Sequence, residues 1–157
     1  MQVSRDFLIA EASQADLYAG GVAQNIPGGC AVAEKMRGRV LVVDDEETVG
    51  VGMSEILKDE GFEAAYVVSG RDAVAAIRDN SYHLVFMDMI MPEMNGLDTF
   101  REIKKVRPDT KVVLFTGYFR DAEDVILQGI REGMIDEFIR KPYFADEIVR
   151  SARKYAS

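Results

Sequence analysis

Short, uninterrupted apolar runs alternate with amphipathic segments along most of this chain, and this alternation constrains the fold more than any other feature. Three runs, at residues 40–43, 84–87 and 112–115, are rich in β-branched or aromatic side chains and carry no charge. Runs of this kind are typical of strands buried on both faces, as in a parallel sheet. Residues 64–68 and 137–140 form two weaker candidate strands.

Helical patterns fill the gaps between the candidate strands. Each strand is followed by a segment with apolar residues at three- and four-residue spacing, and these stripes begin at Val49, Ala73, Leu97, Val125 and Phe144. Parallel neighbours need crossover connections, which are usually helices and nearly always right-handed. We therefore predict an α/β domain, a doubly wound five-stranded parallel sheet with helices on both faces.

The first 38 residues differ from the rest of the chain. They contain glycine-rich stretches at residues 20–21 and 27–29 and no long apolar run. We predict a flexible N-terminal extension or linker over residues 1–38, followed by the folded domain over residues 39–157. An alternative is a docking helix over residues 3–18 that covers a partner surface.

Charge and composition exclude several function classes. The 157 residues include 19 Lys and Arg against 27 Asp and Glu, which gives a net charge of -8. This acidic balance argues against nucleic acid as a direct partner and against docking on an anionic membrane. Because Cys30 and His83 are the only residues of their types, a disulfide framework and a Cys- or His-based metal centre are excluded. No apolar run approaches the length of a membrane-spanning helix, so we expect a cytoplasmic protein.

Polar residues stand where the candidate strands end. Asp44 and Asp45 directly follow the first strand, and Asp88, Thr116 and Lys141 stand at the ends of the third, fourth and fifth strands. Doubly wound sheets bind ligands beyond the carboxyl ends of their strands, which share one edge. We therefore expect these five side chains to surround one small pocket.

Three carboxylates in one pocket repel one another, and a hard divalent cation removes that penalty. The cluster therefore predicts a Mg²⁺ site for a phosphoryl group, with Lys141 as a positive charge and Thr116 as a hydroxyl donor. Asp88 is the natural nucleophile for an aspartyl phosphate, because it ends a central apolar strand. An Asp after a strand is often only a helix cap or turn residue, so the prediction depends on the joint occurrence of the set.

Four motifs at these positions together resemble the receiver domain of two-component response regulators, of the stand-alone chemotaxis-regulator type. They are Val-Val-Asp-Asp-Glu at residues 42–46, Met-Asp-Met-Ile-Met-Pro-Glu-Met-Asn-Gly at 87–96, Thr-Gly at 116–117 and Lys-Pro at 141–142. The resemblance covers about residues 39–155. It implies a flavodoxin-like sheet with strand order 2-1-3-4-5 and a phosphoprotein of phosphorelay signal transduction.

The resemblance also implies roles for individual residues. Asp88 would accept a phosphoryl group from a phosphohistidine on a sensor histidine kinase. Asp45 and Asp88 would bind Mg²⁺ directly, together with the backbone carbonyl of Ile90. Asp44 would act through a metal-bound water.

The remaining implied roles concern the response to phosphorylation. Lys141 would contact the phosphoryl oxygens, and its peptide bond to Pro142 would be cis. Thr116 would hydrogen-bond the phosphoryl group and move toward it, and Phe138 would change rotamer as Thr116 moves. The added charge of about -1.5 to -2 would repack the fourth helix and fifth strand into a surface read by a downstream protein.

Three functions stay open on the sequence alone. The favoured one is a stand-alone switch that signals by protein–protein contact and has only weak self-catalysed phosphorylation and dephosphorylation. The second is a receiver module of a larger hybrid histidine kinase or multidomain regulator, with residues 1–38 as linker. The third is a Mg²⁺-dependent phosphatase with an aspartyl-phosphate intermediate. Such an enzyme would want an acid/base Asp two residues after its nucleophile, where this chain has Ile90.

Overall fold

Five parallel strands form the centre of the domain in the computed structural model, which describes residues 37–117, 119–133 and 135–157. The strands are β1 (Arg39–Val43), β2 (Glu63–Val67), β3 (Leu84–Asp88), β4 (Lys111–Thr116) and β5 (Glu137–Arg140). Their order in the sheet is β2-β1-β3-β4-β5. The predicted order is thus confirmed, and each predicted strand lies within one residue of the observed one at both ends.

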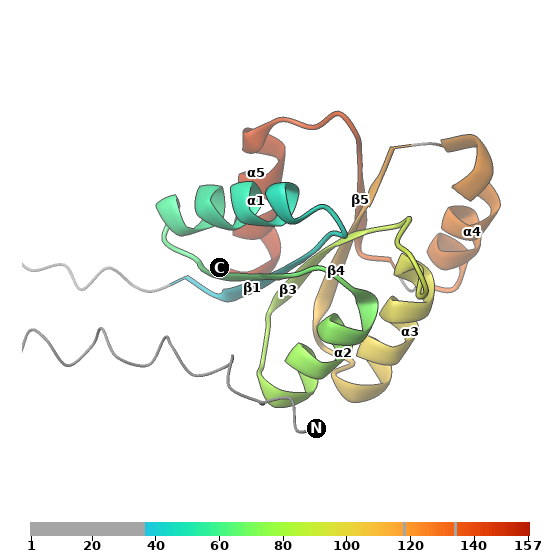
Figure 1. Cartoon of the computed structure of the whole chain (residues 1–157), viewed down its shortest axis with the longest axis horizontal. Helices are drawn as coiled ribbons and strands as arrows, with labels where there is room; N and C mark the ends of the chain where they lie inside the picture. The colour runs from blue at the N-terminus through green and yellow to red at the C-terminus, as the bar shows by residue number, and fades with distance from the viewer. Residues whose placement is uncertain (1–36, 118, 134) are drawn as a thin grey trace, which may run out of the picture. The chain divides into compact units, whose positions relative to one another are not determined.

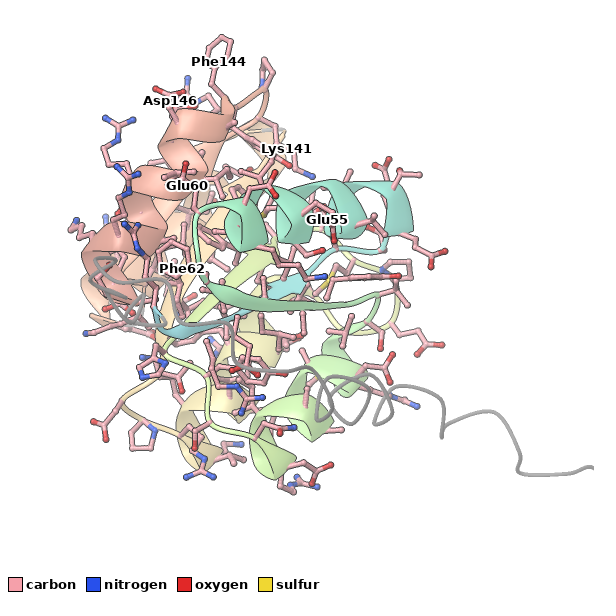
Figure 2. All side chains as sticks on the ribbon, turned by 90° about the vertical axis from the view of Figure 1, so that its left-hand side faces the viewer. Glu55, Glu60, Phe62, Lys141, Phe144 and Asp146 are labelled. Carbon is pink, nitrogen blue, oxygen red and sulfur yellow. The ribbon has the colours of Figure 1, made fainter. Side chains whose placement is uncertain are left out.

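Five helices cover the sheet: α1 (Glu47–Asp59), α2 (Gly70–Asp79), α3 (Gly96–Val106), α4 (Phe119–Arg131) and α5 (Ala145–Tyr155). Helices α1 and α5 lie on one face, and α2 and α3 lie on the other (Figure 1). Ile126 of α4 is buried in the same apolar core as α2 and α3. The doubly wound fold predicted from the alternation is therefore confirmed. In Figure 2, Lys141 and Phe144 are seen on the segment between β5 and α5.

An apolar core on each face of the sheet holds the layers together. Successive strand residues point to opposite faces, so β1 sends Val40 and Val42 into one core and Leu41 and Val43 into the other. The helices contribute their apolar stripes to these cores, for example Leu57 of α1 to the first. Burial on both faces explains why the central strands are apolar without alternation.

Helix α3 begins directly against the carboxyl end of β3. The side chain of Asn95 caps the helix by accepting a hydrogen bond from the Asp98 N–H at 2.8 Å. A Cβ atom on Gly96 would lie only 2.6 Å from the backbone oxygen of Asp88. Glycine at position 96 therefore lets the helix approach the strand end at which Asp88 stands.

The two described residues before β1, Arg37 and Gly38, form backbone hydrogen bonds with the rest of the domain. The Arg37 N–H donates to the Gly61 carbonyl at 3.2 Å, and the Gly38 N–H donates to the Ala156 carbonyl at 2.6 Å. Residues 1–36 lie outside the part of the chain that the structure describes. The flexible extension predicted for residues 1–38, which contains Cys30, and the alternative docking helix over residues 3–18 therefore stay predictions. Among the described helices, none is long and apolar enough to cross a membrane.

Two glycines inside α1 have opposite surroundings, and this difference generates a prediction. A Cβ on Gly50 would lie 2.9 Å from Cδ2 of Tyr66, whereas a Cβ on Gly52 would meet nothing within 4 Å. We expect Gly52→Ala to raise the free energy of unfolding by about 0.5–1 kcal/mol, because alanine restricts the unfolded chain and favours helix. Gly50→Ala should lower it, because the helix must move away from β2. Urea unfolding of both variants tests this, and a stabilised Gly50→Ala would contradict the packing described.

Candidate functional site

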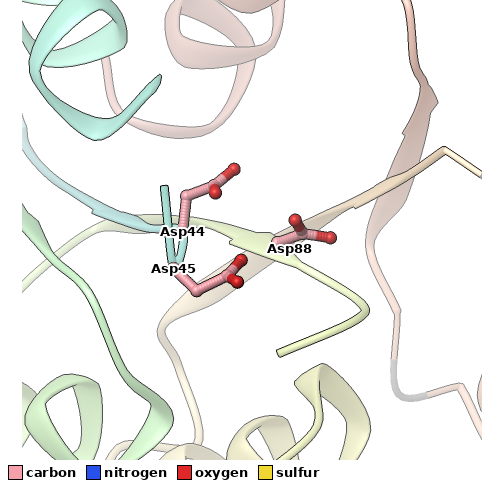
Figure 3. Close-up of side chains that lie close together, drawn as sticks. All are labelled: Asp44, Asp45 and Asp88. Atoms are coloured by element: carbon pink, nitrogen blue, oxygen red, sulfur yellow. The ribbon is translucent and has the colours of Figure 1, made fainter. Parts of the chain in front are cut away.

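The acidic residues predicted to form a cluster do lie together at the carboxyl edge of the sheet. Strands β1 and β3 are neighbours with Val43 opposite Met87, so the next residues, Asp44 and Asp88, stand side by side. Asp45 follows in the turn before α1, and one carboxylate oxygen from each of the three lies within 4.8 Å of the others. Figure 3 shows the three carboxylates gathered between these two strand ends.

Lys141 brings the positive charge to this cluster from the end of β5. Its Nζ lies 2.9 Å from Oδ2 of Asp88 and 3.4 Å from Oδ2 of Asp44. The Lys141 backbone N–H donates to the Thr116 carbonyl at 2.8 Å, which fixes the end of β5 against the end of β4. The Lys141–Pro142 peptide bond is cis, as expected. One ammonium thus pairs with both buried carboxylates.

Asp44 is the most deeply buried of the three carboxylates, with 1% of its surface exposed. Its Oδ1 accepts a hydrogen bond from the Glu46 N–H at 2.9 Å. Burial raises the pKa of Asp44 above its usual range and the charge of Asp88 adds to the rise, although the Glu46 hydrogen bond and the charge of Lys141 act in the opposite direction. Burial is thus the largest influence on this carboxyl, and Lys141 offsets it only in part.

The two buried carboxylates also act on the pKa of Lys141. Burial alone would lower it, but the hydrogen bond to Asp88 and the charges of Asp88 and Asp44 outweigh this effect, so the pKa is raised. Lys141 is accordingly a permanent positive charge near neutral pH. Its half-buried position keeps its ion pairs partly shielded from solvent.

Asp88 is held in place through both of its carboxylate oxygens. Oδ2 contacts Lys141, and Oδ1 accepts a hydrogen bond from the Ile90 N–H at 3.1 Å. The residue is 8% exposed, whereas the Ile90 side chain beside it is 56% exposed. A carboxylate that is anchored on two sides and still reaches solvent is suited to act as a nucleophile. The Ile90 carbonyl as a metal ligand stays a prediction.

Thr116 and Phe138 lie on the two strands beyond β3. Asp88 pairs in register with Phe115, so Thr116 stands one position further along β4 and is buried. Phe138 pairs with Leu114 and packs, half-buried, against the core under α2, α3 and α4. The two residues are therefore placed between the acidic cluster and α4, and their movement on phosphorylation stays a prediction.

The donor set fits a hard divalent cation. The three carboxylates, Asp44, Asp45 and Asp88, supply the oxygen ligands that Mg²⁺ prefers, and exposed Asp45 leaves the cluster open to water. Lys141 offsets only part of the repulsion among these carboxylates, and a cation bound here would offset the rest. These three residues would hold the ion, which would supply charge neutralisation to an incoming phosphoryl group.

Residues 40–153 match the family model of the response regulator receiver domain. This chain belongs to the response regulator receiver family. It is 33% identical over 117 residues to the chemotaxis protein CheY of Thermotoga maritima, a match that covers 74% of this chain and 95% of CheY. Members of the family are in general signalling switches of two-component systems rather than true enzymes.

Longer proteins and solved structures match the same region. The DNA-binding response regulator MtrA of Mycobacterium tuberculosis is 34% identical over 120 residues, which is 76% of this chain and 51% of MtrA. The chain thus spans about half the length of the MtrA proteins it matches. The crystal structure of the NtrX receiver domain from Brucella abortus superposes with a TM-score of 0.65 at 35% identity and covers 73% of this chain and 95% of that one.

One residue at the site was not singled out by the sequence patterns. The ring of Tyr143, two residues after Lys141, packs on Phe115 with 4.8 Å between the ring centroids. Its position after the Lys-Pro pair was the only available signal, because the sequence does not show which strand a loop side chain contacts. Glu46 also takes part in the site, because its backbone N–H donates a hydrogen bond to Oδ1 of Asp44. A pattern of side chains in the sequence does not reveal a backbone contact of this kind.

The charge imbalance predicts how Mg²⁺ and Asp45→Asn change stability. Without Mg²⁺, Asp45→Asn should unfold at a higher temperature than the wild type, because one of three repelling carboxylates is gone. With Mg²⁺ at about 100 times its Kd, the wild type should gain about 2.7 kcal/mol, and the variant should gain less than half of that. Thermal unfolding in EDTA and in MgCl₂ measures both effects.

Asp79→Asn is the matched control, because this exposed carboxylate ends α2 at the opposite edge of the sheet. It should leave the Mg²⁺ effect unchanged. Equal stabilisation of the wild type and Asp45→Asn by Mg²⁺ would show that the ion does not bind the cluster.

Proposed function

We propose that this protein is a phosphorylation-activated signalling switch in which Asp88 accepts a phosphoryl group from a sensor histidine kinase in a Mg²⁺-dependent reaction. The observation that carries the proposal is the position of Asp88. It stands at the end of a central strand, beside two further carboxylates, with its Oδ2 at 2.9 Å from the Lys141 ammonium. Isolated acidic residues at strand ends do not share an ammonium in this way.

The proposed transfer is a displacement at phosphorus. A carboxylate oxygen of Asp88 forms the new O–P bond, the P–N bond of the donor phosphohistidine breaks, and the imidazole leaves with the bonding electrons. The Ile90 N–H orients the carboxylate, and Lys141 stabilises the negative charge on the phosphoryl oxygens. Positioning and charge neutralisation are the main requirements of phosphoryl transfer, and these residues meet both.

The proposed readout follows from the charge that the new group adds. A carboxylate becomes an acyl phosphate with a charge of about -1.5 to -2, which attracts hydrogen-bond donors. Thr116 is the buried hydroxyl at the end of the next strand, and Phe138 packs into the core shared with α4. We propose that these residues carry the change to α4 and β5, where a downstream protein reads it. A cytoplasmic location and the absence of direct nucleic-acid contact are part of the same proposal.

Two further functions were open from the sequence. A module within a larger regulator is compatible with the relatives, because the matched region makes up 95% of CheY but 51% of MtrA. A phosphatase with many turnovers is less well supported. The residue two positions after Asp88 is Ile90, whose aliphatic side chain points no acid or base toward the site.

The proposal predicts the outcome of incubation with acetyl phosphate and Mg²⁺. Intact-mass measurement should show the gain of one phosphate in the wild type, and the gain should be absent in Asp88→Asn and in EDTA. Asp79→Asn, which removes an exposed carboxylate far from the cluster, should behave as the wild type. Phosphate uptake that persists in Asp88→Asn would place the acceptor elsewhere. Continuous release of phosphate over many turnovers would favour the phosphatase instead.

A further inference from the structure

Three aromatic rings pack in a row in the core under α1 and α5, and the last of them belongs to Tyr143, two residues after Lys141. Phe86 of β3 stacks on Phe115 of β4 with ring centroids 5.4 Å apart and an interplanar angle of 17°. Phe115 in turn packs against Tyr143 at 4.8 Å and 32°. Phe86 and Phe115 are fully buried, and Tyr143 is half-buried at the solvent end of the row. The row therefore connects the rigid interior to the segment that carries Lys141.

The strand under Tyr143 is fixed relative to the phosphoacceptor. Phe115 pairs in register with Asp88, and the Phe115 carbonyl accepts a hydrogen bond from the Met89 N–H at 2.9 Å. The carbonyl of the next residue, Thr116, accepts a hydrogen bond from the Lys141 backbone N–H at 2.8 Å. The ring of Tyr143 thus rests on the same strand end that holds Asp88 and Lys141 together.

Tyr143 is the inward-facing residue of its segment. The segment is tied at one end by the Lys141 backbone and at the other by the Phe144 N–H, which donates to Oε2 of Glu147 at 2.8 Å. Pro142 is exposed and Phe144 is 74% exposed. Packing of this short segment onto the sheet therefore depends on the ring of Tyr143.

The charged groups of the site act on the pKa of Tyr143. Burial raises the pKa of Tyr143, the charge of Lys141 lowers it, and the charges of Asp44 and Asp88 raise it further. The charge of Glu46 raises it as well, so four charged groups act on this hydroxyl. The ring itself packs on Phe115 at the margin of the apolar core.

We propose that Tyr143 is a positioning residue for phosphoryl acceptance, because its ring, packed on Phe115, fixes the backbone from which Lys141 reaches Asp88 and Asp44. The inference rests on the proposed function of Asp88. A lysine side chain is long and flexible, so its ammonium has a defined position only when its backbone is fixed. A misplacement of about 1 Å can lower a reaction rate about 100-fold.

The test compares two substitutions by the rate of phosphate uptake from acetyl phosphate with saturating Mg²⁺, followed by intact mass. Tyr143→Leu keeps an apolar side chain but removes the stacked ring, and it should slow uptake at Asp88 by about tenfold or more. Tyr143→Phe keeps the ring and should restore the rate to within about twofold of the wild type. Circular dichroism and thermal unfolding record whether each variant is folded.

A double substitution separates positioning from general loss of structure. In Lys141→Met the ammonium is absent, so Tyr143→Leu should cause almost no further loss of rate in that background. Phe86→Leu, at the buried end of the same row, is the control. It should lower the unfolding temperature more than Tyr143→Leu does and leave the uptake rate of the folded protein unchanged.

Each outcome decides for or against the inference. Uptake by Tyr143→Leu at the wild-type rate, or an equal loss in Tyr143→Phe, would overturn it. The inference would also be overturned if Tyr143→Leu slowed phosphate uptake by the same factor in the Lys141→Met background as in the wild type. The ring would then act independently of the ammonium. A wild-type protein that takes up no phosphate would contradict the proposed function, and this inference would fall with it.

Discussion

Negative charge crowded at one edge of the sheet, opposed by a single ammonium, is the interaction around which this domain is organised. Asp44 and Asp88 are buried within reach of the same Lys141, and Asp45 adds a third carboxylate. Removing carboxylates from water costs several kcal/mol per ion, and only close pairing and hydrogen bonds offset that cost. The backbone N–H groups of Glu46 and Ile90 supply such bonds. The described cluster nevertheless carries more negative than positive charge, and this excess favours the binding of a cation.

The sheet topology brings these charges together without any local sequence proximity. Because β1 and β3 are neighbours, residues 44 and 88 stand at adjacent strand ends, and β4 and β5 place Thr116 and Lys141 beyond them. Two apolar cores pack against the strands from both faces and hold the strand ends next to one another. The close start of α3 at Gly96 fixes the backbone of Asp88 further. A rigid frame of this kind gives a reacting group its precise location.

Most of the fold and the members of the cluster could be predicted from the sequence, because both depend on patterns that are periodic or positional. Apolar runs locate the strands, and polar residues at their ends locate the pocket. The contacts that depend on how one element sits on another could not be predicted. Spacing alone does not distinguish Gly50, which packs against Tyr66, from Gly52, which meets open space. In the same way, nothing local shows that the Tyr143 ring packs on a ring 28 positions earlier in the chain.

The hydrogen bond between Gly38 and Ala156 has a practical consequence. It joins the two ends of the folded unit at the amino edge of the sheet, whereas the acidic cluster occupies the carboxyl edge. A fusion partner attached directly to either end of this folded unit would therefore start from the edge opposite the acidic cluster. Ends this close also suit circular permutation, in which a short linker joins them and new termini are opened at an exposed loop.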